Sequence, residues 1–343
     1  MLTFDPEALD TLVHRATGHR PTGIEPMPGG ASTRRYLRVR TPAASLVAMF
    51  VPDAAPEEIT SGATGGSARW PFLEVHALLD GRGVRVPRLH AEACEQGLLL
   101  IEDLGDETLA AFLERSPARR AEVYRVAVTD LAAAQRSLGA LPAGSVVATR
   151  AFDETLLRWE LDHFREWGLD ARGRALAPEA RARFDALADR LARRIAAWPR
   201  GFVHRDYQSR NIMVREGAGG SLELTWIDFQ DALLGPRVYD LVALLNDSYQ
   251  SFDRPFIEAR LDEFAAAAGL DAEGRAALGR EFDVVTVQRK LKDAGRFIFI
   301  DQVKKNPAFL PYFEPSLAKV RAALERLSSD PDMRELAAIV ALA

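Results

Sequence analysis

The sequence has 343 residues, of which 48% are hydrophobic and 27% charged, and this balance indicates a globular rather than a disordered protein. Its formal net charge of -5 argues against nucleic acid or an anionic membrane as the main partner. Cys94 is the single cysteine, which excludes an internal disulfide and a cysteine-rich metal site.

The N-terminal stretch MLTFDPEALDTLVHRATG is acidic early and lacks the basic-then-apolar pattern of a secretory signal. No stretch reaches the roughly 18 uncharged apolar residues that a membrane helix needs. We therefore expect a cytoplasmic, monomeric protein that binds neither membranes nor nucleic acid.

The first hundred residues predict a small lobe rich in strands. Apolar residues recur at helical spacing near the start, and alternating or continuous apolar runs typical of strands follow. In chain order we expect a helix over 5–18, strands over 34–40 and 45–51, a glycine-rich loop over 61–68, a helix over 70–82, and two strands before Gly105.

Helical patterns dominate after Asp103, with one short hairpin among them. We expect helices over 106–115, 118–138, 153–168 and 178–198, hairpin strands over 202–214 and 222–232, and helices over 236–251, 255–268, 271–300 and 314–327. The pattern predicts an α+β protein with an N-terminal nucleotide-binding lobe over residues 1–103 and a catalytic, substrate-binding lobe over 104–343.

The hairpin carries the strongest chemical signal. The segment HRDYQSRN places Asp206 five residues before Asn211, and WIDFQD places Asp228 at the end of the following apolar strand. This spacing matches the phosphoryl-transfer pattern, in which one aspartate receives or orients the attacking hydroxyl and an Asn–Asp pair holds Mg²⁺. Oxygen ligands suit Mg²⁺, which also keeps phosphate and water ligands. We therefore predict Asp206 as the base, Asn211 and Asp228 as metal ligands, and His204 as a packed core residue.

Two segments of the small lobe are candidates for nucleotide binding. PGGASTRRY is a small-residue turn whose backbone could approach a phosphate, although a plain hairpin turn would look the same. LLLIEDLG runs into a polar turn at the lobe boundary, where backbone groups would hold a base and Glu102 could equally be structural. The candidates are Gly30, Ala31, Ser32, Thr33, Arg34 and Arg35 in the turn, and Glu102, Asp103 and Leu104 at the boundary.

These motifs, together with IDFQDALLGPRVYDLVALLNDSY and VQRKLKDAGRF, resemble the aminoglycoside phosphotransferase/choline kinase superfamily. Within it, the chain is most similar to bacterial N-acetylmuramate/N-acetylglucosamine kinases, which phosphorylate the anomeric hydroxyl during cell-wall recycling. The resemblance extends over nearly the whole chain. It implies a two-lobed protein-kinase-like fold, ATP and Mg²⁺ as cofactors, and a small amino sugar as substrate.

One element of the kinase pattern is missing. All five lysines lie at or after position 290, so the small lobe has none to pair with Glu74. Met49 or Phe50 stands where the lysine of protein kinases would be. Our hypothesis is that Arg34 or Arg35 carries the phosphate charge instead, since the guanidinium fork fits phosphate oxygens.

The acceptor is expected to bind near the hairpin in the helical lobe. A carboxylate on an acidic sugar would favour a cation, for which Arg205 and Arg289 are candidates, and Trp159 lies on a helix that could line the cleft. Two alternatives stay open: an aminoglycoside- or choline-type kinase, and a pseudokinase that binds nucleotide without turnover. The candidate acceptor residues are Arg205, Gln208, Gln230, Asp231, Asp247, Tyr249, Arg289 and Glu160.

Overall fold

The computed structural model describes residues 3–28, 34–52 and 70–342, and there the chain forms a strand-rich small lobe and a larger helical lobe. This arrangement confirms the two-lobed α+β architecture expected from the sequence. The boundary placed after residue 103 stays a prediction, because one hydrophobic core includes residues on both sides of it, such as Val47 and Ile101 before it and Leu109 after it.

The small lobe is built on a five-stranded antiparallel sheet with the order β1-β2-β3-β5-β4. On one face of the sheet, α1 buries Leu9 and Leu12 against Leu46, so the other face is left for the large lobe. The elements are α1 (Pro6–Thr17), β1 (Gly23–Pro26), β2 (Arg35–Arg40), β3 (Ser45–Phe50), α2 (Pro71–Asp80), β4 (Leu89–Ala93) and β5 (Leu98–Glu102).

The large lobe consists of helices around two short strand pairs, β6 with β9 and β7 with β8. Aspartate caps begin several of its helices, as at Asp153, Asp253 and Asp271, each of which accepts a backbone amide hydrogen bond. The elements are α3 (Leu109–Arg115), α4 (Arg120–Ser137), α5 (Glu154–His163), α6 (Pro178–Ala196), β6 (Arg200–Val203), β7 (Ile212–Glu216), β8 (Leu222–Trp226), β9 (Leu233–Pro236), α7 (Tyr239–Leu245), α8 (Arg254–Ala268), α9 (Ala272–Gln302), α10 (Phe313–Arg326) and α11 (Pro331–Val340).

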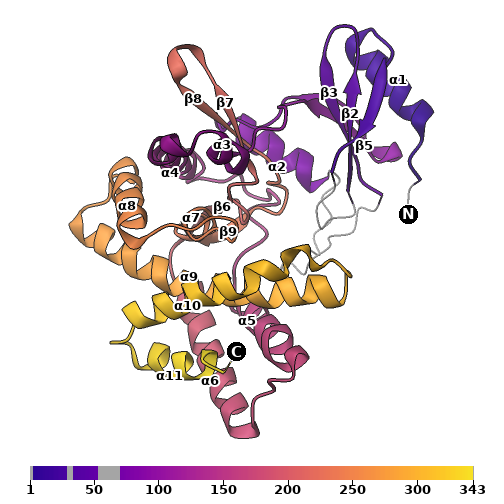
Figure 1. The fold of residues 1–343 in the computed structure, drawn as a ribbon. Helices are drawn as coiled ribbons and strands as arrows, with labels where there is room; N and C mark the ends of the chain where they lie inside the picture. Colours follow the sequence, from indigo (N-terminus) through magenta and orange to yellow (C-terminus); the bar gives the residue numbers. More distant parts are fainter. Residues whose placement is uncertain (1–2, 29–33, 53–69, 343) are drawn as a thin grey trace.

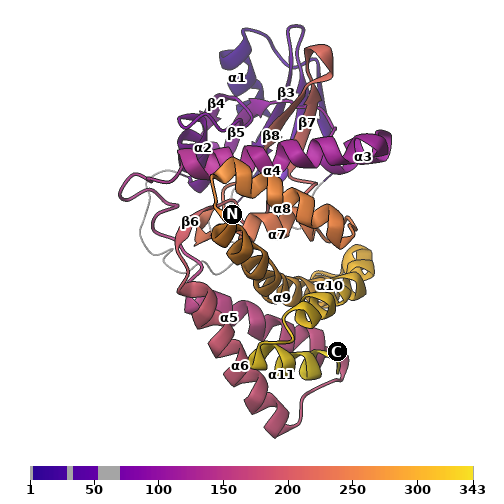
Figure 2. The ribbon, with the colours of Figure 1, turned by 90° about the vertical axis from the view of Figure 1, so that its left-hand side faces the viewer.

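The long helix α9 is the organising element of the large lobe. Figures 1 and 2 show the small lobe at one end of the molecule, α5, α6 and α11 at the other, and α9 between them. A Cβ added to Gly295 of α9 would lie 2.7 Å from the carbonyl oxygen of His163, so α9 approaches the end of α5 backbone to backbone. Beyond His163 the chain continues as a π-helical segment, Phe164–Leu169, instead of the single α-helix expected over 153–168.

The structure corrects the expected strands of the large lobe. The sequence predicted one long hairpin, whereas only β7 and β8 form it, and β6 pairs with β9 in a separate ladder. The division arises because the polar segments at 204–211 and 227–232 interrupt the strands and form loops. These two loops carry the predicted chemistry, so the strand pairs act as their rigid supports.

Two helices also differ from expectation. The helix predicted over 236–251 ends at Leu245, and Lys319 of α10 donates hydrogen bonds to the carbonyls of Asn246 and Gln250 in the segment that follows. The helix α11 was not predicted. Within the described ranges, no helix is both long and apolar enough to span a bilayer.

Candidate active site

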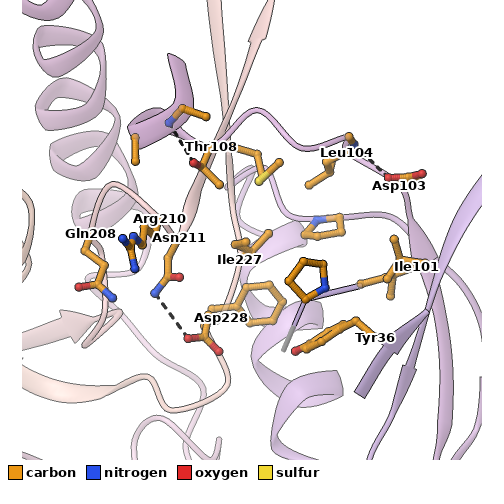
Figure 3. Close-up of a pocket in the computed structure, with 18 of the residues that line it drawn as sticks. Tyr36, Ile101, Asp103, Leu104, Thr108, Gln208, Arg210, Asn211, Ile227 and Asp228 are labelled. Atoms are coloured by element: carbon orange, nitrogen blue, oxygen red, sulfur yellow. Dashed lines mark hydrogen bonds between the residues drawn. The ribbon is translucent and has the colours of Figure 1, made fainter. Parts of the chain in front are cut away.

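A cavity of about 740 Å³ lies between the lobes and reaches from β5 to the loop over residues 204–211, called the catalytic loop below because it carries the predicted base. Val47 of β3 and Ile101 of β5 line one side of it, while Asn211 and Asp228 lie on the other (Figure 3). An apolar slot that opens onto polar oxygens suits a nucleotide, whose base needs burial and whose phosphates need charge.

Asp240, the second residue of α7, holds the backbone of the catalytic loop. Its carboxylate accepts hydrogen bonds from the amides of His204, at 2.7 Å, and Arg205, at 3.0 Å. Arg205 has a φ of 79°, a left-handed conformation that costs free energy for a residue with a side chain. Burial raises the pKa of Asp240 to about 7, and the two amide bonds oppose this rise.

His204 connects the two loops of the site as a packed residue. Its side chain is buried, its Nδ1 accepts from the Asp206 amide at 3.3 Å, and its Nε2 lies 3.0 Å from the carbonyl oxygen of Ile227. Burial lowers the pKa of His204 to about 4, so the ring is neutral and its Nε2 carries the proton. It therefore fixes the spacing between Asp206 and the residue before Asp228.

Asp206 forms an ion pair with Arg289, a buried residue of α9. Arg289 donates from one terminal nitrogen to Asp206 Oδ1 at 3.1 Å and from the other to the carbonyl of Arg205 at 2.6 Å. Desolvation alone would raise the pKa of Asp206, but the charges of Arg289, Lys292 and Arg205 outweigh it and lower the pKa. An ionised carboxylate held at one oxygen can use its other oxygen to orient a hydroxyl and accept its proton late in the transfer.

Asn211 and Asp228 meet across the end of the cavity. Asn211 Nδ2 donates to the carbonyl of Asp206 at 2.9 Å and lies 3.5 Å from Asp228 Oδ2, an approach drawn in Figure 3. The amide oxygen of Asn211 is thereby left for another ligand. Gln230 donates to Asp228 Oδ1 at 2.9 Å and fixes the other side of that carboxylate.

The charges at this point fit a divalent cation. Desolvation and the neighbouring charge of Asp206 raise the pKa of Asp228, so the two carboxylates repel each other in the protein alone. The described residues hold no group of three His, Cys, Asp or Glu side chains that could bind a metal by themselves. One carboxylate and one amide oxygen are what Mg²⁺ needs when phosphate and water supply its other ligands.

Arg34 is the cation that faces this pair from the small lobe. Its guanidinium lies 3.4 Å from Asp228 Oδ1 and 3.9 Å from Asp231 Oδ2, and it lines the cavity. On β3, Val47 and Met49 belong to the core on the cleft side, whereas Phe50 packs on Phe4 at the α1 face. Met49, and not Phe50, therefore occupies the position of the missing lysine.

Arg35 lies on the other side of its strand. Residues of a strand alternate between faces, and β2 directs Tyr36 into the cavity while Arg35 is exposed. Arg35 therefore points away from the cavity and from Asp228. The turn residues Gly30, Ala31, Ser32 and Thr33 lie outside the described residues.

The segment over residues 102–104, at the end of β5, lines the cavity, and hydrogen bonds of its side chains hold it in place. Asp103 accepts from Arg38 Nε at 2.8 Å and from the hydroxyl of Ser45, so its carboxylate is used within the protein. Burial would raise the pKa of Asp103, but these hydrogen bonds outweigh it and lower the pKa. Glu102 accepts from the Arg88 amide at 3.1 Å, and Leu104 lines the cavity with both residues.

The eight acceptor candidates separate into three groups. Gln208 and Tyr249 line the cavity, and Gln230 and Asp231 flank Asp228. The other four are buried and bind the protein itself: Arg205 and Glu160 approach each other at 4.0 Å, Asp247 accepts from the amides of Ser209 and Tyr249, and Arg289 holds Asp206.

Sequence reasoning missed three contributors to the site. Asp240 appeared as part of a helix, and Arg210, which lies 3.6 Å from the Tyr249 ring centre and lines the cavity, was not named as a candidate. Lys292, whose charge acts on Asp206, was not considered. A helical projection of VQRKLKDAGRF would have placed Lys292 one turn from Arg289, and this was the available signal.

A two-lobed fold with a nucleotide-sized cleft, a cation-held aspartate and an Asn–Asp pair defines a phosphoryl-transfer enzyme of the kinase type. The model of the phosphotransferase enzyme family matches residues 23–278. The chain therefore belongs to the phosphotransferase enzyme family, and it is an enzyme that transfers a phosphoryl group to a hydroxyl acceptor.

Curated relatives extend the similarity over most of the chain. An N-acetylmuramate/N-acetylglucosamine kinase from Pseudomonas aeruginosa is 35% identical over 328 residues, covering 94% of this chain and 88% of the relative. A protein of the same name from Neisseria meningitidis is 33% identical, covering 88% and 90%. The family resemblance given by the motifs is thus confirmed.

Solved structures agree on the fold. The choline kinase of Streptococcus pneumoniae superposes with a TM-score of 0.59 at 13% identity, covering 92% of this chain and 98% of that one. An ADP-bound aminoglycoside phosphotransferase gives 0.57 at 13% identity, covering 92% and 97%. At 13% identity the likeness shows the fold alone and does not identify the acceptor.

Proposed function

We propose that the protein is an ATP- and Mg²⁺-dependent cytoplasmic kinase that phosphorylates the anomeric hydroxyl of N-acetylmuramate and N-acetylglucosamine. The observation that carries the proposal is the constellation of Asp206, Asn211 and Asp228, of which the last two line the cavity, in a chain whose curated relatives are named for these two sugars. The cytoplasm is the compartment in which ATP is available to such an enzyme.

In the proposed reaction the nucleotide base lies in the apolar slot beside Ile101 and Leu104, and the phosphates extend toward Asp228. Asn211 and Asp228 would hold Mg²⁺, which offsets phosphate charge when it is bound. Arg34, at the same end of the cavity, contributes a second positive group that cannot lose its proton.

The acceptor hydroxyl is oriented by Asp206. Because its pKa is lowered, Asp206 is a weak base toward a ground-state hydroxyl. In a loose phosphoryl-transfer transition state, the hydroxyl becomes acidic only as its bond to phosphorus forms, so the carboxylate can then take the proton. Arg289 keeps the carboxylate in place during this step without binding the sugar, since its guanidinium is buried and donates to the protein from both terminal nitrogens.

The aminoglycoside- and choline-type alternatives are disfavoured by charge. Those acceptors are cations and would need carboxylates around Asp206, whereas Arg205, Arg289 and Lys292 surround it here. The pseudokinase alternative is disfavoured because Asp240 of α7 holds the backbone before Asp206, and Arg289 of α9 bonds the Asp206 carboxylate, neither of which nucleotide binding alone requires.

The direct test is to incubate the protein with Mg-ATP and a panel of N-acetylmuramate, N-acetylglucosamine, glucosamine, choline and kanamycin. Phosphorus NMR then locates the new phosphate. We expect a sugar 1-phosphate from the two N-acetylated sugars, and a product from choline or kanamycin alone would refute the proposal.

A further inference from the structure

Three of the chain's five lysines lie on α9 and α10, and the charge of Asp293 acts on each of them. Two of them serve the protein's own structure. Lys319 donates to the carbonyls of Asn246, Asp247 and Gln250, and Lys290 is almost completely buried. The third, Lys292, has a different position and a different set of contacts.

Lys292 shares its carboxylate partner. Asp293 accepts from Lys290 Nζ at 2.7 Å and from Lys292 Nζ at 3.3 Å, so one negative charge faces two ammonium groups. Lys292 has the longer of the two contacts, and its side chain is 16% exposed against 2% for Lys290. An ammonium group has three N–H donors. Among the described residues, Asp293 takes one of the donors of Lys292.

The position of Lys292 follows from the geometry of α9. Arg289 touches Asp206, and Lys292 lies three residues further on the same face, about 4.5 Å along the helix axis. Asp206 itself is 38% exposed in its side chain, so it is accessible to an acceptor, and the charge of Lys292 acts on it. The charged and titratable groups acting on Lys292 come from three helices: Arg289 and Asp293 of α9, Glu160 of α5 and Tyr239 of α7.

We infer that Lys292 binds a carboxylate of the acceptor and makes this site favour an acidic sugar over a neutral one. Because Arg289 contacts Asp206 and Lys292 follows it by about one turn of α9, one acceptor molecule can present its hydroxyl to Asp206 and its carboxylate to Lys292. The inference rests on the proposed function and assigns the specificity of its acceptor site. Lys292 thereby takes the role that the sequence suggested for Arg205 or Arg289, whose guanidinium groups are buried.

The experiment compares kcat/KM for N-acetylmuramate, its methyl ester and N-acetylglucosamine, of which only the first carries a carboxylate. For Lys292→Met, the preference for the acid over the two neutral sugars should fall about 10- to 100-fold, as expected for one lost hydrogen bond between charged groups. Lys292→Arg should retain most of the preference. Because loss of the lysine also changes the charge near Asp206, all three rates can fall together, and the ratio removes that shared effect.

Lys304→Met is the matched control, since Lys304 is exposed beyond the end of α9, and all three rates should stay as in the wild type. Arg210→Met tests a cation that lines the large-lobe side of the cavity. An unchanged ratio in Lys292→Met, or a fall in the ratio caused by Arg210→Met instead, would overturn the inference. A wild type that phosphorylates neither sugar would refute the proposed function itself, so the two failures are distinguishable.

Discussion

The two sides of the cleft carry positive charge in different ways. On the small-lobe side, β3 presents buried Met49, and Arg34 reaches Asp228 from the end of the chain segment before β2. On the large-lobe side, Arg289 is buried and makes two hydrogen bonds, to Asp206 and to the loop backbone. The phosphate end thus depends on one arginine at the margin of the sheet, whereas the acceptor end is a rigid network. Substitutions on the two sides should therefore affect different kinetic constants.

The largest effect should come from the carboxylate at the centre of the large-lobe network. Asp206→Asn removes the group that orients and deprotonates the acceptor, and kcat should fall about 10³-fold, within the range of a lost general base. ADP release with saturating N-acetylmuramate measures it. Nucleotide affinity should change little, because Asp206 does not line the cavity.

Asp231→Asn is the control for that change, since Asp231 is half exposed and reaches Arg34 only at 3.9 Å. Its kcat should stay within about threefold of the wild type, as expected for a weak exposed ion pair. If both variants lost activity equally, the special role given to Asp206 would be wrong.

The small-lobe side is tested by two adjacent arginines. Arg34→Ala should raise the KM for ATP and lower kcat/KM about 10- to 100-fold, because it removes a charge from the phosphate end. Arg35→Ala should stay within about twofold, because Arg35 points away from the cleft. Steady-state kinetics with varied ATP decide it, and equal values for both variants and the wild type would refute the hypothesis that arginine replaces the missing lysine.

The large-lobe network predicts a different kinetic signature for Arg289. Arg289→Met frees the Asp206 carboxylate and the Arg205 carbonyl, so kcat should fall about tenfold while the KM for ATP stays unchanged. Arg289→Lys can replace only one of the two bonds and should recover part of kcat. A rise in the KM for ATP without loss of kcat would place Arg289 on the nucleotide side and break the comparison.

Much of this architecture could be predicted because the signals are local. The spacing of Asp206, Asn211 and Asp228 lies within one hairpin unit, and strand and helix periodicities identified both lobes. The missing lysine was visible as an absence of one residue type before position 290. Patterns of this kind need no knowledge of tertiary contacts.

The roles of the surrounding charges could not be predicted, because they depend on burial and on helices far apart in sequence. Arg289 looked like an acceptor ligand, yet α9 brings it beneath the loop, where its donors are used by Asp206 and Arg205. Asp247 looked similar and instead binds the Ser209 amide at 2.8 Å. A sequence shows that a side chain is charged, and only the packing decides whether that charge faces the substrate or supports the loop.

A last prediction, on stability instead of activity, concerns a carboxylate in the same lobe that accepts from an indole instead of a cation. Asp130 accepts from Trp226 Nε1 at 2.7 Å, and burial raises its pKa from 3.8 to about 6, opposed by that hydrogen bond. The native state therefore holds this proton more tightly than the unfolded state, so stability from this group is present below pH 3.8 and is lost as pH rises through 6.

Asn at position 130 stays neutral and keeps an acceptor for Trp226. The stability of Asp130→Asn relative to the wild type should thus increase between about pH 4 and pH 7, by up to about 3 kcal/mol. Urea denaturation at several pH values measures this difference. If the difference in unfolding free energy stayed constant across that range, Asp130 would ionise in the native state at little cost. A buried carboxylate of this lobe would then need no neighbouring cation of the kind that Arg289 provides for Asp206.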